Sequence, residues 1–400
     1  MHRIDGPGAL PGGGFTAGNA QAGEQGTVLT PEWAFAIQEE IAAIIEGQGI
    51  PLDKGNNGQL LQALGVMGGM RNVLINPEFF HWQRHAGPAY QMTVASGEAK
   101  FGPDRWLCVG GGGAGESTVY SSNASGTGGS AALSTYGFGA GPREWSLKYS
   151  RLSADDTSDG YLAQRIENVW TLQGTSAVLS FWVSPLVGNF TIKARLRQHF
   201  GTGGTPSPDV LIEPVEVGGL TPPAFSWTQL VFHFDVPNLL GQTLGTDGNH
   251  YLELQLDFGS TVSQLSLKRA QLEQGKAPSG YEWRPRDLEL AYCRRYYETS
   301  YERGTAPGTA TARGALYAQQ AGASTAALSN RYLVRKRALA SHFWFDPETG
   351  TPGVVRHNGT LNTPLTPGAT LSPDSFGRWT LVNSEPESEL VAHFAAEAEL

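Results

Sequence analysis

The order of hydrophobic and polar residues divides the chain into a short helical start and a much longer β-rich remainder. Between residues 30 and 46, apolar side chains recur every three or four positions, which predicts a helix with one apolar stripe. The stripe consists of Trp33, Ile37, Ile41 and Ile44. Thr30 can cap this helix, and Pro31 suits its first turn. A second, shorter helix is predicted after Asn57.

These two helices are too short to form an independent domain. Residues 1–29 are mostly Gly, Ala and polar residues, so they cannot bury a core of their own. Two short helices also bury too little surface to be stable alone. We therefore expect the apolar stripe to pack against another protein or another copy of the chain.

From residue 71 onward, short apolar runs alternate with turn-forming clusters. Residues 229–236 and 251–258 alternate polar and apolar positions, as half-buried antiparallel strands do. Further runs of this kind lie at 73–75, 177–183 and 190–196, and turn clusters such as 201–206 separate them. Short strands at this spacing predict a sandwich or a jelly roll.

A second β-like unit is expected after a stretch rich in Gly, Ala and Thr at 304–330. Its apolar runs lie at 331–334, 342–345, 353–355, 379–382 and 390–394. We predict a mainly β protein with three parts: an N-terminal attachment arm with helices (1–70), a central sandwich (71–298) and a small C-terminal β-domain (299–400).

Composition supports this division and excludes several classes of protein. Gly (52 residues) is abundant and charged residues reach only 16%, which suits a chain with many turns. A net charge of -9 argues against nucleic acid as the main partner. The basic stretch 331–337 is interpreted as a strand with one charged face. No run of 18 apolar residues occurs, so we expect no membrane insertion.

The N-terminus and the cysteines indicate where the chain is made. The N-terminus lacks the pattern of a secretory signal. Cys108 and Cys293 lie among aromatic and aliphatic neighbours, and two cysteines so far apart do not suggest a disulfide framework. We interpret them as buried free thiols in a chain made in a reducing cytoplasm.

Motifs for catalysis, metals and cofactors are weak. The glycine-rich stretch Gly110–Ser117 has Glu116 where a phosphate-binding loop needs lysine. The acidic turn Asp155–Gly160 lacks the spacing of a calcium loop. No His or Cys cluster has metal-ligand spacing, and no pair of carboxylates can be assigned from the sequence alone. We therefore expect no metal, no cofactor and no enzymatic activity.

The chain is rich in aromatic residues, with 10 Trp and 13 Tyr. Flat rings can stack on the apolar faces of sugars while nearby polar groups bind the hydroxyls. Most of these rings lie within strand-like runs, where packing in the core is the more common role. Rings that are exposed on the β-scaffold are thus candidates for saccharide binding.

Several strings of residues resemble bacteriophage tail-fibre proteins. Residues 14–64 resemble the region by which such fibres attach to the tail. The most specific set is Leu74-Ile75-Asn76 with Trp82-Gln83-Arg84, then Asp104-Arg105-Trp106, and Tyr292-Cys-Arg-Arg-Tyr-Tyr297. In tail fibres similar strings bracket a jelly roll that resembles a carbohydrate-binding module. The ending, residues 393–400, resembles a terminal tip domain.

The resemblance implies a homotrimer in the virion, made in the host cytoplasm. Its N-terminus would dock on tail or baseplate proteins through Trp33, Ile37, Ile41 and Ile44. Its β-domains would bind a receptor on the host surface, which we expect to be a saccharide. As contacts we predict exposed side chains near the C-terminus, namely Trp344, Trp379, Tyr332, Tyr317, Arg337 and His342. Two alternatives stay open: a tailspike that degrades the glycan it binds, and a purely structural baseplate or fibre adaptor.

Overall fold

A computed structural model shows the chain as two compact units. Unit 1 contains Met1–Arg71 together with Ala277–Glu282, and unit 2 contains Asn72–Lys276 together with Trp283–Leu400. The structure describes residues 3–47, 50–67, 70–87, 90–111, 117–125, 144–151, 160–187, 192–215, 224–259, 263–319, 325–362, 366–367, 371–382 and 389–400.

Unit 1 is helical, as its sequence pattern predicts. Helix α1 spans Pro31–Gly47, and α2 spans Gln59–Met67. The Trp33 amide donates a hydrogen bond to the Thr30 hydroxyl (3.4 Å), which confirms the predicted cap. Ala42 and Ile45 of α1 and Ala63 of α2 are buried, so each helix buries one face within the unit.

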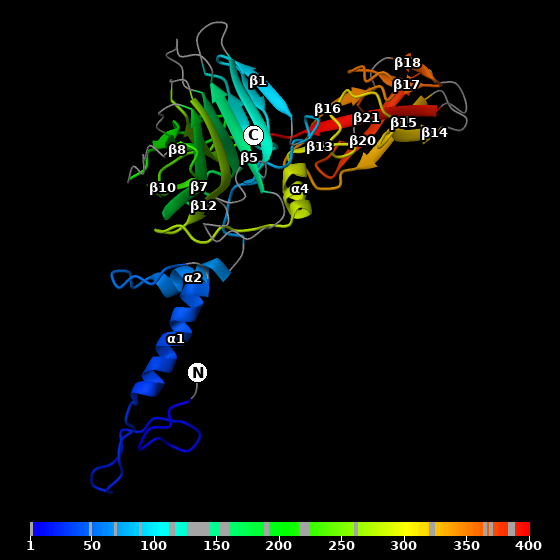
Figure 1. Cartoon of the computed structure of the whole chain (residues 1–400). Helices are drawn as coiled ribbons and strands as arrows, with labels where there is room; N and C mark the ends of the chain where they lie inside the picture. The colour runs from blue at the N-terminus through cyan, green and yellow to red at the C-terminus, as the bar shows by residue number, and fades with distance from the viewer. Residues whose placement is uncertain are drawn as a thin grey trace. The chain divides into compact units, whose positions relative to one another are not determined.

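Unit 2 contains a sandwich of two antiparallel sheets, each with six strands (Figure 1). In order across the first sheet, the strands are β1 (Gln91–Ala95), β4 (Ser117–Ser125), β5 (Glu144–Arg151), β12 (Ser263–Gln274), β7 (Ser176–Val187) and β10 (Thr228–Asp235). The second sheet consists of β2 (Ala99–Phe101), β3 (Leu107–Val109), β6 (Tyr161–Glu167), β11 (Tyr251–Asp257), β8 (Lys193–His199) and β9 (Val210–Ile212). The predicted β-rich jelly-roll class is confirmed.

The sandwich follows from alternation along its strands. In β11, the buried Leu254 faces Leu196 of β8 across the ladder, while Glu253 on the opposite face pairs with Arg197. The inward side chains of both sheets, among them Phe181 and Phe232, form one core. One predicted strand is absent, because residues 73–75 run as irregular chain: the Val73 amide donates to the Leu272 carbonyl of β12, whereas the amide and carbonyl of Ile75 bind the side chain of Gln164.

A short helix, α4 (Arg286–Arg294), connects the sandwich to a second set of sheets. The strands of this C-terminal domain are β13 (Tyr297–Thr299), β14 (Leu316–Gln319), β15 (Thr325–Arg331), β16 (Ser341–Phe345), β17 (Val355–His357), β18 (Thr360–Asn362), β19 (Thr366–Pro367), β20 (Ser375–Val382) and β21 (Glu389–Glu397). Strand β21 is central, since β13, β14, β16 and β17 all pair with it.

The predicted strand at 331–334 is wrong. Only Arg331 belongs to a strand, as the last residue of β15, and the chain then turns inward. Tyr332 is buried in the core of the C-terminal domain, and Lys336 is buried against Glu298. The basic stretch therefore does not form one exposed charged face.

Two expectations about the chain's environment can be compared with the structure. Cys108 and Cys293 are both buried free thiols, as predicted, and burial raises the pKa of each. No helix among the described residues has the length and apolarity needed to cross a membrane.

Candidate functional site at the junction of the β-domains and on the sandwich

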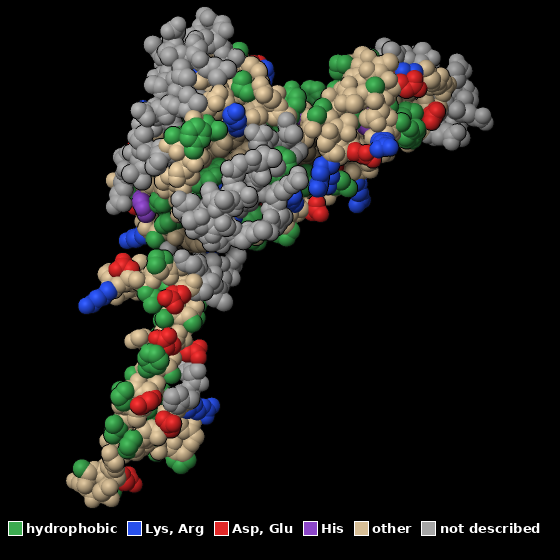
Figure 2. Space-filling view, in the orientation of Figure 1, with side chains coloured by type: hydrophobic (Ala, Val, Ile, Leu, Met, Phe, Trp, Pro, Cys, Tyr) green, Lys and Arg blue, Asp and Glu red, His purple; other side chains and the backbone are tan. Residues whose placement is uncertain are grey.

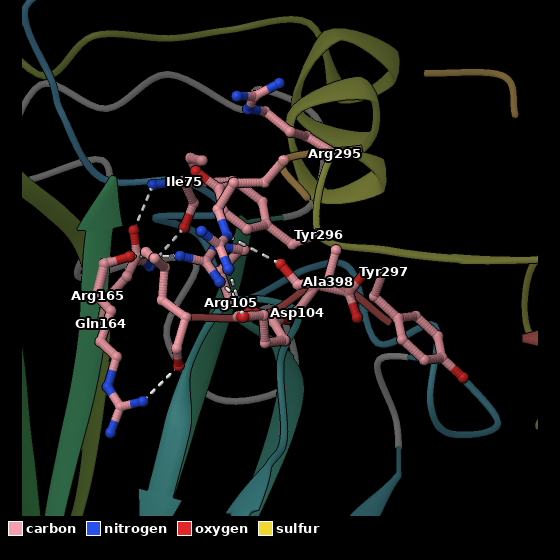
Figure 3. A network of polar contacts seen from close by, with 12 residues as sticks. Ile75, Asp104, Arg105, Gln164, Arg165, Arg295, Tyr296, Tyr297 and Ala398 are labelled. Atoms are coloured by element: carbon pink, nitrogen blue, oxygen red, sulfur yellow. Dashed lines mark hydrogen bonds and ion pairs between the residues drawn. The ribbon is translucent and has the colours of Figure 1, made fainter. Parts of the chain in front are cut away.

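The strings with the most specific resemblance come together where the sandwich meets the C-terminal domain (Figure 3). Asn76 is the centre of this junction. Its side-chain oxygen accepts hydrogen bonds from the amides of Phe80 and His81, and its side-chain nitrogen donates to the carbonyls of His81 and Asp104. Its φ of 54° is in the left-handed region, which asparagine tolerates better than most residues.

The final residues of the chain pack on this junction. Arg105 and Arg84 both pair with the carboxylate of Glu399, and Arg165 of β6 donates to the carbonyl of Leu400. Arg105 also lies 3.5 Å from the centroid of the Tyr296 ring. Burial lowers the pKa of Arg105 to about 10, so it stays charged near neutral pH. The C-terminal segment thus lies against the sandwich, as Figure 3 shows for Ala398.

A second set of contacts joins β6 to the chain that follows α4. Arg295 binds both carboxylate oxygens of Glu167, at 2.7 and 2.8 Å, and the Tyr296 hydroxyl donates to the same carboxylate at 3.0 Å. Arg337 donates to the carbonyls of Ala398 and Glu399. The junction is therefore a continuous polar network between two packed domains.

A small pocket lies beside this network, with a cavity volume of about 50 Å³. Its wall comes from three segments: residues 80–87 of the sandwich, α4, and residues 299–305 of the C-terminal domain. Among the lining residues, His81 donates its Nε2 hydrogen to the Arg286 carbonyl (2.9 Å). Burial lowers the pKa of His81 to about 4, so this side chain is neutral at physiological pH.

The outward face of β6, β11 and β8 carries a second ordered polar array. Arg165 and Arg197 both bind the Glu253 carboxylate, at 2.9 and 3.0 Å. The Arg197 guanidinium also donates to the Tyr251 hydroxyl (2.8 Å), and the His199 ring stacks on the Tyr251 ring with centroids 4.5 Å apart. These side chains hold one another in place at the surface of a rigid sheet.

An exposed tryptophan lies at the end of this sheet. Trp170 is 45% exposed and sits 4.6 Å from the His250 ring. It stands on a turn closed by hydrogen bonds from the Thr171 amide to Asn168 and from the Gln173 amide to Trp170 itself. The ring is therefore held in position before any ligand arrives.

Polar groups on the neighbouring loop are ordered as well. Asn249, which precedes His250, binds the amide and the hydroxyl of Thr202, each at 2.8 Å. The Thr202 hydroxyl in turn donates to Asp247 (2.7 Å). We call Trp170, Thr202, Asp247, Asn249 and His250 the loop-end surface. Through its contact with His250, the exposed ring is linked to a loop that carries fixed hydroxyl, amide and carboxylate groups, and saccharides require both kinds of contact.

The predicted receptor residues lie mostly elsewhere than expected. Trp344, Trp379 and Tyr332 are at most 8% exposed and belong to the core of the C-terminal domain, so the premise that these rings are exposed is wrong. The physical reason is that Trp344 on β16 and Trp379 on β20 pack against each other, with ring centroids 5.4 Å apart, while Tyr332, which follows β15, packs against Phe376. Alternation alone did not reveal which face of each strand is covered.

The other three predicted receptor contacts differ in their exposure and in their hydrogen-bond partners. Tyr317 on β14 is 59% exposed, and its receptor role stays a prediction. His342 is half-buried, and its Nε2 lies 2.5 Å from the Tyr332 hydroxyl. Arg337 is held in the junction by the backbone of Ala398 and Glu399.

The predicted docking stripe on α1 is partly open. Trp33 packs edge-on against Phe15, with centroids 5.4 Å apart, and Ile37 is half-buried. Ile41 and Ile44 are exposed within unit 1. Their role in docking stays a prediction.

The weak motifs add nothing to the site. The acidic turn at 155–160 and most of the glycine-rich stretch at 110–117 lie outside the described residues. Within the described part of the chain, no group of three His, Cys, Asp or Glu could hold a metal ion.

The sequence analysis did not single out Trp170 or the junction pocket. The signal for Trp170 was its position after Asn168, a turn former, instead of inside an alternating run. No local signal exists for the pocket, because its wall comes from three distant segments.

Comparison with known proteins gives limited matches. No family model matches the chain. The uncharacterized protein StfP of Escherichia coli (strain K12) is 40% identical over 73 residues, which is 17% of this chain and 35% of StfP. The chain therefore covers only about a third of that relative's length.

Several solved structures show a weak similarity to about half of the chain. An enzymatically active domain of a bacteriophage CBA120 tailspike protein covers 51% of this chain and 21% of its own (TM-score 0.27, 11% identity). A putative sugar binding protein from Bacteroides thetaiotaomicron covers 51% of this chain and 100% of its own, with a TM-score of 0.30 and 12% identity. The CBM22-1 xylan-binding domain of Paenibacillus barcinonensis Xyn10C covers 47% of this chain and 95% of its own, with a TM-score of 0.27 and 12% identity. At these identities and TM-scores, the likeness carries no conclusion about ligand or activity.

Proposed function

We propose that this chain is a bacteriophage tail-fibre or tail-tip protein that attaches to the tail through unit 1 and binds a host-surface saccharide through unit 2. The observation that carries the saccharide part is Trp170, an exposed ring held against His250 on a hydrogen-bonded turn. The virion part rests on the resemblance of residues 14–64, 72–84, 103–106, 271–275 and 292–297 to tail fibres. In this proposal the chain binds without cleaving and needs no cofactor.

The loop-end surface offers both kinds of contact that a sugar needs. The Trp170 ring can stack on the apolar face of a pyranose, and the Asn249 and Asp247 side chains can bind its hydroxyls. Since Thr202 and Asn249 already hold each other in place, little side-chain entropy is lost on binding. A single surface of this size gives weak binding, and several copies per particle would raise it by avidity.

Unit 1 would attach to the tail through α1. Phe35, Ile41 and Ile44 are exposed on this helix, which carries four acidic and no basic residues. Figure 2 shows acidic side chains along the helical part of unit 1, with hydrophobic side chains between them. The complementary partner is a tail or baseplate protein with an apolar groove bordered by Lys or Arg.

A homotrimer fits the spacing on the same helix. Ala34, Ile37, Ile41 and Ile44 follow a three-four-three spacing, and isoleucine at both inner positions of such a repeat favours more than two strands. A trimer formed in this way buries Ile41 and Ile44, so Phe35, which lies outside this row, and the acidic side chains of α1 would then contact the tail protein. Light scattering on the purified chain should give three times 42.8 kDa, and Ile41→Asp should reduce this mass.

The binding experiment uses the full chain, host cells and extracted surface polysaccharide, with reducing ends measured in the same samples. We expect saturable binding, no release of reducing ends, and binding about tenfold weaker per site in Trp170→Ala, since roughly 1.4 kcal/mol corresponds to a factor of ten. Phe225→Ala is the matched control, because it removes an exposed ring of the sandwich that lies outside the loop-end surface. Equal binding by wild type and Trp170→Ala would contradict the assignment of the loop-end surface.

One observation favours a structural adaptor as the second candidate. The C-terminal domain exposes four large apolar side chains, which suit a protein partner better than a sugar. They are Tyr317, Leu333, Leu339 and Phe343. The adaptor predicts no binding to the polysaccharide by any variant. Release of reducing ends would instead assign the chain to the glycan-degrading tailspikes.

A further inference from the structure

We propose that the junction pocket receives the carboxylate of an acidic sugar, so that the saccharide bound by this protein contains a uronic or similar acid. This inference rests on the proposed function and names the class of saccharide. The carrying observation is Arg294, the last residue of α4, which lines the pocket. Its Nε is buried and has no hydrogen-bond partner among the described residues.

The charges around the pocket leave Arg294 as the cation without a counter-ion. Arg303 also lines the pocket, but it pairs with Asp287 at 2.7 Å. Glu302, the acidic lining residue, lies 3.8 Å from Arg313. Within the described part of the chain, no carboxylate forms an ion pair with Arg294. An anion that enters the pocket would therefore meet a net positive charge.

Other charged groups near Arg294 are already engaged. The buried Lys336 donates to the Arg294 carbonyl and pairs with Glu298 at 2.5 Å. His81 is neutral near pH 7 because burial lowers its pKa to about 4. The guanidinium of Arg294 is thus the group available to a ligand, and its planar fork matches a carboxylate in shape.

The size of the cavity decides which part of a sugar can enter. A cavity of about 50 Å³ has room for three to five water-sized groups, on the basis of roughly 10–15 Å³ for each. Pockets that enclose whole small ligands are usually about 300–1,000 Å³. A carboxylate has three heavy atoms and fits, whereas a sugar ring has to stay at the mouth. There the half-buried Phe80 ring can meet its apolar face.

The test uses Trp82 as an internal reporter. Trp82 lines the pocket, and its indole N–H donates to the Phe79 carbonyl (2.8 Å). In full-length protein with ¹⁵N-labelled tryptophan, the Trp82 indole signal is followed by NMR during addition of D-glucuronate, D-glucose or acetate. We expect a saturable shift with glucuronate, a much weaker response to acetate and none to glucose.

Variants assign the response to Arg294. Arg294→Gln should weaken glucuronate binding at least tenfold. Arg294→Lys keeps the charge but loses the planar guanidinium, so its affinity for glucuronate should lie between those of the wild type and Arg294→Gln. The control is Arg335→Gln, because this arginine is 69% exposed, lies outside the pocket wall and is only loosely paired with Asp374. Thermal unfolding of each variant confirms that it is folded. A glucuronate response that persists in a folded Arg294→Gln variant overturns the proposal.

Two further outcomes also overturn it. Equal responses to glucose and glucuronate would show that the pocket does not recognise the carboxylate. If acetate bound as tightly as glucuronate, the pocket would not recognise the sugar ring. Failure here is distinguishable from failure of the proposed function, because polysaccharide binding that depends on Trp170 can persist without any Trp82 response. Conversely, Trp170→Ala should leave the Trp82 response unchanged.

Discussion

The buried ion pair between Lys336 and Glu298 gives the sharpest prediction about stability. Their side chains are 0% and 3% exposed, and the atoms Nζ and Oε2 are 2.5 Å apart. The same ammonium group donates to the carbonyls of Arg294 and Val334. Its three protons are therefore all used, and each acceptor comes from a different part of the junction.

Replacing Lys336 with methionine keeps most of the side-chain volume but removes the charge. Glu298 is then a buried carboxylate without its cation, and two carbonyls lose a donor. Breaking a buried pair in this way costs roughly 3–5 kcal/mol. With a urea m-value of about 2 kcal/mol/M, the unfolding midpoint of the C-terminal domain should fall by about 2 M.

Urea unfolding followed by tryptophan fluorescence measures this shift, since Trp344 and Trp379 report on the core of that domain. The neighbouring Arg335→Gln is the matched control, because Arg335 is 69% exposed and only 3.8 Å from Asp374. We expect its free energy of unfolding to change by less than about 0.5 kcal/mol. The double variant Lys336→Met/Glu298→Leu should lose less stability than Lys336→Met alone.

Two results would refute this reasoning. A loss below about 1 kcal/mol for Lys336→Met would show that water reaches the pair and screens it. Additive losses in the double variant would show that the two side chains do not interact energetically.

Three more predictions follow from burial. Burial lowers the pKa of His81 and His342 from 6.5 to about 4. Between these values the unfolded chain binds protons that the folded chain does not, so stability is full above pH 6.5 and falls as the pH drops toward 4. Thermal unfolding at pH 7, 6 and 5 checks this, and a flat profile would contradict it. Cys108 and Cys293 are fully buried with raised pKa values, so a thiol reagent should modify neither in native protein and both in urea. Trp344→Ala should destabilise the C-terminal domain by about 3–5 kcal/mol in urea unfolding, and a loss of polysaccharide binding without unfolding would contradict its place in the core.

The hydrophobic pattern within a single element was enough to predict those helices and strands whose signals lie in their own sequence. Helix α1 has a cap, a first-turn proline and a regular stripe, and the structure places it within one residue of the expected range. Strand β11 alternates closely and begins where predicted. In both cases the sequence within the element predicts its type and its bounds, although in α1 the buried residues are Ala42 and Ile45 and not the Ile41 and Ile44 of the predicted stripe.

Helix α4 and the exposure of the aromatic rings could not be predicted in this way. Helix α4 has nine residues, and its buried face, which includes Leu290 and Cys293, is defined by the segments packed around it. The exposure of Trp344 depends on its place opposite Phe394 in β21. Contacts such as Arg84 with Glu397 join residues that are more than 300 positions apart, so only the folded chain brings them together.

The C-terminal domain is attached to the sandwich at both of its ends. The chain enters it through α4 and β13, and β21 returns beside β13 to the residues that bind Arg105 and Arg165. A domain joined to its neighbour by a single linker can rotate about that linker. A domain that is also held by a second set of contacts cannot rotate without breaking those contacts. A load applied to the outer loops would thus be shared between two routes into the sandwich.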